Sequence, residues 1–258
     1  MSDRPRQLHL EALKLGPVNR PRLARYLELP SVTQMDPVTD EEIQKLDERR
    51  DELLSPWLGA VVAPIERAYG RWIELKGDAP PVEATVEYVS RLNESGADVL
   101  VVAAFTIGGR VDELIRAHLD REDVYEAFVL KQWAATMTEQ ARVALAKGLR
   151  HWCEQREQSL LPHDGPGYNG WPLTSLWPLL DLLYGGLQPT DERPIRATES
   201  GVLLPTNSMV IVHGVTSRRV PGGRFEERLA QCHRCAMPNC RYRVSAMAAD
   251  VAGASQSP

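Results

Sequence analysis

Three of the four cysteines lie within nine residues near the C-terminus, at Cys232, Cys235 and Cys240, whereas Cys153 stands alone. The two-residue spacing of the first pair lets both thiolates reach one metal ion from a tight turn, and the third cysteine can add a ligand after the Pro-Asn turn that precedes it. Zinc and iron–sulfur clusters both use cysteine thiolates, and this spacing does not separate them. The segment therefore predicts a metal site that holds either zinc or an iron–sulfur cluster.

The residues around these cysteines favour charged thiolates. Arg234, Arg241 and Arg243 would stabilise the thiolate form and offset the negative charge of a metal–thiolate unit. The sequence does not assign a fourth ligand, which could be His233, Cys153, a water or a group from a partner. The alternative interpretation is three surface thiols or a redox-active pair.

A second candidate is the loop at residues 161–172, in which three glycines, three prolines, Tyr168 and Trp171 occur together. Glycine lets a backbone approach a ligand closely, and aromatic rings offer flat surfaces for a heterocycle. His163 and Asp164 can supply polar contacts. The pattern predicts a small-molecule site, and the alternative is a structural loop that places one ring in the core.

The composition excludes several classes of protein. The chain has 258 residues, with 30 Lys and Arg against 35 Asp and Glu, a formal net charge of −5 and a sequence pI of about 5.8. No global basic field favours nonspecific nucleic-acid binding. The longest apolar run, residues 99–105, is too short to cross a bilayer, and the polar start shows no secretory signal. Four cysteines in a chain of this length do not form a disulfide scaffold. We therefore expect a cytoplasmic protein with reduced thiols, and neither nucleic acid nor membrane as a partner.

Hydrophobic periodicity places the two candidate sites on a mixed set of helices and strands. The continuous, largely β-branched run at 99–105 predicts a strand that is buried on both faces. Apolar residues at steps of three and four over 124–158 predict the longest helix. Thr39 is the predicted N-cap of an earlier helix. Further helices are predicted at 22–29, 65–75, 82–93, 111–119 and 173–183, and a pair of strands at 202–204 and 209–213.

This order of elements predicts an α+β or α/β fold in one main domain. Residues 1–38 hold several prolines around one short helix and are predicted to form an N-terminal arm. Residues 39–228 would form the domain, residues 229–245 the cysteine-rich metal or cluster segment, and residues 246–258 a disordered tail of small and polar residues.

Three blocks resemble the activation (reactivation) domain of cobalamin-dependent methionine synthase and its stand-alone relatives, and they occur in the same order. The first block is Pro166-Gly167-Tyr168, which precedes an aromatic-proline stretch and a helix. The second, about thirty residues later, is Thr198-Glu199-Ser200 with Leu204-Pro205 and Ser208. The third is the strand at 99–105, which is followed by Thr106-Ile107-Gly108. The stand-alone relatives often end in a Cys-x2-Cys-x4-Cys-x-Tyr-Arg segment, similar to residues 232–243 here. The resemblance covers roughly residues 20–243.

The resemblance implies an α/β (α+β) fold with a twisted, largely antiparallel sheet and flanking helices. It implies that S-adenosylmethionine binds at His163, Pro166, Gly167 and Tyr168, with Glu199 and Pro205 shaping the far wall. The family carries an arginine at the position of His163. A histidine is neutral much of the time near pH 7 and lacks the bidentate fork of arginine, so we expect weaker binding of a ligand carboxylate.

The function implied by the resemblance is support of the reductive reactivation or methylation of a corrinoid protein. The cobalamin would belong to that partner, a corrinoid protein or methyltransferase, and an electron donor protein would be a further partner. The chain would then be a component of cobalamin-dependent methyl transfer, with no catalytic residue assigned. The alternative is a non-catalytic module that binds a ligand or a partner and carries a structural zinc. An independent S-adenosylmethionine-dependent methyltransferase is disfavoured because the usual glycine-rich loop after a first strand is absent.

Overall fold

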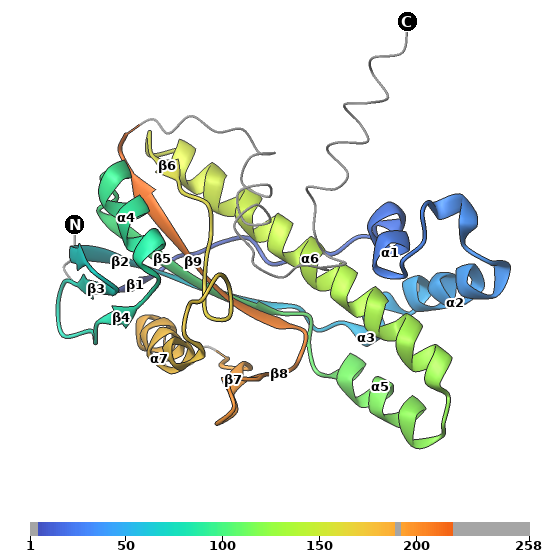
Figure 1. Cartoon of the computed structure of the whole chain (residues 1–258). Helices are drawn as coiled ribbons and strands as arrows, with labels where there is room; N and C mark the ends of the chain where they lie inside the picture. The colour runs from blue at the N-terminus through green and yellow to red at the C-terminus, as the bar shows by residue number, and fades with distance from the viewer. Residues whose placement is uncertain (1–4, 189–191, 219–258) are drawn as a thin grey trace, which may run out of the picture.

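The computed structural model describes residues 5–188 and 192–218 (Figure 1). Its main element is an antiparallel sheet in the order β4-β3-β2-β5-β9-β6, with β1 also paired to β2. The strands of this sheet are β1 (Arg6–Gln7), β2 (Trp57–Tyr69), β3 (Trp72–Leu75), β4 (Val82–Glu83), β5 (Val99–Thr106), β6 (Ser159–Leu160) and β9 (Ser208–Thr216). A separate hairpin pairs β7 (Arg196–Ala197) with β8 (Leu203–Leu204).

Strand β5 is the centre of the sheet, and all eight of its residues are buried. It pairs with β2 on one side, where Val101 lies opposite Val62, and with β9 on the other, where Val101 lies opposite His213. Because successive side chains of a strand point to opposite faces, its residues divide between two separate hydrophobic clusters. The buried strand predicted at 99–105 is confirmed.

Helices cover both faces of the sheet. The cluster on one face packs the odd-numbered residues of β5 against α6 (Val124–Glu154), which runs along the sheet in Figure 1, and against the other helices of that face. The cluster on the other face packs the even-numbered residues against α4 (Val86–Ser95) and α7 (Leu176–Gly186). The remaining helices are α1 (Arg20–Tyr26), α2 (Pro37–Glu48), α3 (Arg50–Leu53) and α5 (Arg110–Asp120), with short 3-10 turns η1 (Val32–Gln34) and η2 (Leu173–Ser175).

The prediction of a helix at 65–75 is wrong, because these residues finish β2 and form β3. The two strands join at a tight turn in which Gly70 has a φ of +56°. Ile73 and Leu75 are buried while Glu74 between them is half-buried and pairs across the strands with Arg67, which is the alternation of a strand. Pro64, a residue type that breaks a helix interior, lies within β2 opposite Val99.

Two more expectations about local structure are wrong. The strands predicted at 202–204 and 209–213 do not pair with each other, because β8 pairs with β7 while β9 pairs with β5 and β6. The cap of α2 is Asp36 rather than Thr39, since its carboxylate accepts the Thr39 N–H at 3.0 Å and Pro37 takes the first helical position. Within the described ranges, no helix combines the length and the apolar character needed to cross a membrane.

Candidate functional site

The loop between β6 and α7 begins as an extra stretch of strand against β9. Asp164 and Val212 exchange two backbone hydrogen bonds, with N···O distances of 3.0 and 2.8 Å. Gly165 follows in close contact with the same strand, because a Cβ placed on it would lie only 2.8 Å from the carbonyl oxygen of Val210. The loop is therefore fixed to the sheet at its start, and a side chain at position 165 would disturb that attachment.

The rest of the loop folds back on itself. The Tyr168 N–H donates to the Gly165 carbonyl at 3.0 Å, and the Gly167 N–H donates to the Trp171 carbonyl at 3.0 Å. Gly167 and Gly170 have φ values of +87° and +83°, which glycine adopts at little steric cost. Trp171 is 2% exposed and anchors the loop in the core, whereas Gly167 is exposed and Tyr168 is half-buried. The predicted residues Pro166, Gly167 and Tyr168 are thus among the accessible residues of the loop.

His163 lies beneath this loop and is only 1% exposed. Its ring lies 5.6 Å from the ring of His213 in β9, and its edge meets the ring of Tyr168 at 6.4 Å, both measured between centroids. The Leu161 carbonyl accepts a hydrogen bond of 2.8 Å from Nδ1 of His213. His163 therefore supports Tyr168 from below instead of forming an open wall beside it.

The second predicted block is the turn that joins β7 to β8. The Gly201 N–H donates to the Thr198 carbonyl at 2.8 Å, which places Glu199 exposed at the tip of the hairpin. A Cβ on Gly201 would lie 3.1 Å from the side chain of Leu173, and a Cβ on Gly167 would lie 3.3 Å from the same side chain. Leu173 thus brings together the loop and the turn, which are about thirty residues apart in sequence.

Pro205 lies at the other end of the hairpin from Glu199. It follows a cis peptide bond and packs near Gly109, where a Cβ would be 3.6 Å from its ring. The next two residues bind the carboxylate of Asp112 in α5, through the Thr206 N–H at 2.7 Å and the Asn207 amide at 3.0 Å. Pro205 therefore belongs to the contact between the hairpin and the start of α5.

The sequence did not single out two residues of α4 that pack against the loop. Nη2 of Arg91 lies 3.3 Å from the Asp164 carboxylate, and the guanidinium carbon lies 4.8 Å from the ring centroid of Tyr88. The Tyr88 ring lies in turn 4.9 Å from the ring of Trp171. Full burial raises the pKa of the Tyr88 hydroxyl well above its ordinary value. The three-residue spacing of Tyr88 and Arg91 indicates a shared helix face, but no sequence signal identifies the loop that this face meets.

Three buried donors of this cluster are without an acceptor. The Tyr88 hydroxyl, the Trp171 Nε1–H and the Arg91 Nε–H have no hydrogen-bond partner among the residues that the structure describes. Buried polar groups in proteins are nearly always paired, so these donors are an unusual feature of the core that supports the loop.

The predicted metal ligands Cys232, Cys235 and Cys240 lie outside the described residues. Cys153 is buried in α6, and this burial raises the pKa of its thiol to about 12. Within residues 5–188 and 192–218, no group of three or more His, Cys, Asp or Glu side chains is arranged to hold a metal ion.

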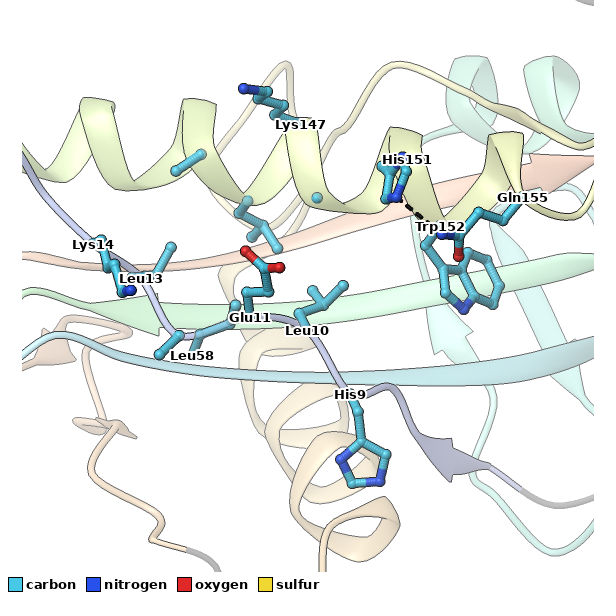
Figure 2. A pocket seen from close by; sticks show the side chains of 14 residues that line it. His9, Leu10, Glu11, Leu13, Lys14, Leu58, Lys147, His151, Trp152 and Gln155 are labelled. Atoms are coloured by element: carbon cyan, nitrogen blue, oxygen red, sulfur yellow. Dashed lines mark hydrogen bonds between the residues drawn. The ribbon is translucent and has the colours of Figure 1, made fainter.

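A separate hollow of about 420 Å³ lies between residues 9–14 and the C-terminal half of α6 (Figure 2). Leu10, Leu58 and Trp152 are among its apolar lining residues, and Figure 2 shows the Glu11 side chain directed toward α6. His151 lies on the same helix, 2.9 Å from the amide of Gln155. None of the residues predicted to bind a ligand lines this hollow.

Comparison with known proteins identifies the fold. No family model matches the chain, and a search of curated proteins finds no match. Among solved structures, the fold is similar to the crystal structure of the MetH reactivation domain bound to AdoHcy, with a TM-score of 0.56. The two chains are 14% identical, and the alignment covers 86% of this chain and 82% of that one. The predicted α/β (α+β) fold, with a twisted, largely antiparallel sheet and flanking helices, is confirmed.

Proposed function

We propose that this chain is a stand-alone protein of the methionine synthase reactivation type, which binds an S-adenosyl ligand and supports the reductive reactivation or methylation of a corrinoid protein. One observation carries the proposal: the loop at 165–171 and the turn at 198–202 meet at Leu173, on a fold similar to a domain that was solved with AdoHcy.

The residues at this place suit the chemistry of such a ligand. Gly167 has no side chain to hold a ligand away from the backbone, and the half-buried ring of Tyr168 offers a face for adenine. The exposed carboxylate of Glu199 can accept hydrogen bonds from ribose hydroxyls or from an ammonium group. In this proposal Pro166 borders the site, while His163 supports Tyr168 and Pro205 holds the hairpin that presents Glu199.

S-Adenosylmethionine would supply the methyl group, and the corrinoid protein would supply its cobalamin. The chain itself would position the donor and exclude water from it.

Three exposed apolar side chains lie next to the site, as expected for a protein that docks on a partner. Leu173 is 45% exposed, Trp177 36% and Val202 48%, and all three lie on or next to the elements that form the site. Exposed large apolar side chains that gather in one area are typical of interaction surfaces. We propose that a corrinoid protein or methyltransferase docks here, with an electron donor protein as a second partner.

The cysteine segment has a separate part in the proposal. Cys232, Cys235 and Cys240 would hold an iron–sulfur cluster for electron input or a zinc that stabilises the C-terminal segment. Metal and acid-labile sulfide content, with an absorption spectrum of protein purified without oxygen, separates the two. Iron, sulfide and a brown colour support electron input, whereas one zinc and no colour support the structural role and the alternative of a non-catalytic binding module.

Calorimetric titration with AdoHcy and S-adenosylmethionine tests the ligand site. We expect saturable binding to the wild-type chain and a Kd raised at least about tenfold in Tyr168→Ala and Gly167→Val, since an aromatic contact and a close backbone approach would be lost. Gly70→Val is the control for backbone strain, because Gly70 also has a positive φ, of +56°, but has open space around it in the β2–β3 turn. Unchanged binding in both loop variants would place the ligand elsewhere.

A further inference from the structure

Helix α4 holds both ends of the loop at 164–171. At the start, the guanidinium of Arg91 lies 3.3 Å from the carboxylate of Asp164. At the end, Trp171 packs on Tyr88, and Tyr88 is covered on its face by the same Arg91 guanidinium. One arginine side chain thus contributes to both attachments.

Asp164 depends on α4 for its counter-charge. The side chain of Asp164 is 3% exposed and that of Arg91 is 18% exposed, so the carboxylate lies in the interior while the guanidinium reaches it from the edge. Residues 161–172 include neither lysine nor arginine, and within the described part of the chain the second oxygen of Asp164 accepts one hydrogen bond, from the N–H of Gly165 at 3.1 Å. A buried charge without its partner is strongly unfavourable, whereas removal of both charges together is often tolerated.

We propose that Arg91 is the positioning residue of the ligand loop, which it holds in its binding conformation through Asp164 and through the Tyr88–Trp171 ring pair. This inference rests on the proposed function, because it assumes that the loop binds an S-adenosyl ligand. Arg91 acts through the loop and needs no contact with the ligand.

The test compares Arg91→Met, Asp164→Asn and the double variant. Arg91→Met leaves the Asp164 carboxylate buried and unpaired, so we expect the Kd for AdoHcy to rise about tenfold or more. In Arg91→Met/Asp164→Asn neither charge is left unpaired, and we expect the Kd to return to within about threefold of wild type. Arg91→Lys keeps the charge but loses the planar fork and part of the ring contact, and is expected to fall between wild type and Arg91→Met. It also serves as the informative variant if Arg91→Met fails to fold.

Hydrogen exchange of the loop amides gives a readout that is independent of the ligand. The N–H groups of Gly167, Tyr168 and Trp171 are hydrogen-bonded within the loop. We expect their exchange to accelerate in Arg91→Met and to recover in the double variant. Arg49→Met is the matched control, because Arg49 also lies close to a carboxylate, 3.0 Å from that of Glu52, but both side chains are about half exposed and the pair is distant from the loop in sequence.

The outcomes separate this inference from the proposed function. Rescue of both loop exchange and affinity in the double variant supports Arg91 as a positioning residue. Normal loop exchange in Arg91→Met overturns this role. It is also overturned if loop exchange recovers in the double variant while the Kd for AdoHcy stays as high as in Arg91→Met, because Arg91 would then contact the ligand itself. If the wild-type chain binds no AdoHcy, the proposed function fails, and the exchange data still decide whether Arg91 holds the loop.

Discussion

The attachment of the loop to β9 makes a quantitative prediction for Gly165→Ala. A Cβ at this position would lie 2.8 Å from the carbonyl oxygen of Val210 and 3.6 Å from the Cα of Ile211. Both atoms belong to the backbone of a strand that is paired on its other side with β5, so they cannot move aside as a flexible side chain would. The loop must therefore move away from the sheet.

The cost follows from the contacts that this movement weakens. Two backbone hydrogen bonds join Asp164 to Val212, and each contributes about 0.5–1.5 kcal/mol net. Their partial or complete loss gives a decrease of about 1–3 kcal/mol in the free energy of unfolding, which matches the usual cost of overpacking a well-filled site. For a chain of this size, the corresponding decrease in Tm is about 3–10 °C.

Urea unfolding followed by circular dichroism measures this decrease, and titration with AdoHcy measures its effect on the proposed site. We expect Gly165→Ala to lose stability and affinity together, because Gly165 precedes the accessible residues 166–168 directly. A variant with wild-type stability and wild-type affinity would refute the close approach of Gly165 to β9 and the reasoning built on it.

Three further predictions concern other parts of the fold. Gly148→Ala should raise the free energy of unfolding by about 0.5–1 kcal/mol, because Gly148 lies inside α6 and, among the described residues, a Cβ there would meet only Leu10, at 3.9 Å; a destabilised variant in urea unfolding would contradict this contact. Cys153 should resist alkylation by iodoacetamide at pH 8 until the protein is unfolded, because its pKa is raised to about 12 by burial; labelling of the native Cys153 peptide, detected by mass spectrometry, would show that α6 does not bury it. Hydrogen bonds from Thr39 lower the pKa of Asp36 in the folded protein. The contribution of Asp36 to the free energy of unfolding should therefore be complete above the ordinary aspartate pKa of about 3.9, and should disappear as the pH falls through the lower pKa of the folded state. Asp36→Asn should therefore have a weaker decrease of stability between about pH 4 and pH 2 than wild type in pH-dependent urea unfolding, and equal decreases would count against this cap.

The elements that the sequence predicted correctly are those with strong and continuous patterns. The apolar run at the centre of the sheet became β5, and the long three- and four-residue periodicity became α6. The sequence did not indicate β2 because Pro56 and Pro64 suggest the breaks of a helix. It did not indicate β3 because the alternation of buried and more exposed residues covers only four positions there. The partner of β8 was missed because β7 has two residues and too little pattern to indicate a strand.

The candidate site could be predicted only in part for a related reason. The glycines and rings of the loop are local signals, and they predicted a small-molecule loop at 161–172, in which the structure leaves Gly167 exposed and Tyr168 half-buried. The Arg91–Asp164 pair joins residues that are 73 positions apart in the sequence, so no spacing rule connects them. The burial of His163 involves a contact with His213, which lies in β9 and is 50 positions later in the sequence.

Hydrogen exchange measured by mass spectrometry, with and without saturating AdoHcy, tests the central claim most directly. The account predicts slower exchange at residues 165–171 and 198–202, where the loop and the turn meet at Leu173, and no change at the hollow between residues 9–14 and α6. Protection of residues 9–14 and 147–155 without protection of the loop would contradict the account, because the ligand would then occupy the hollow on the other face of the sheet.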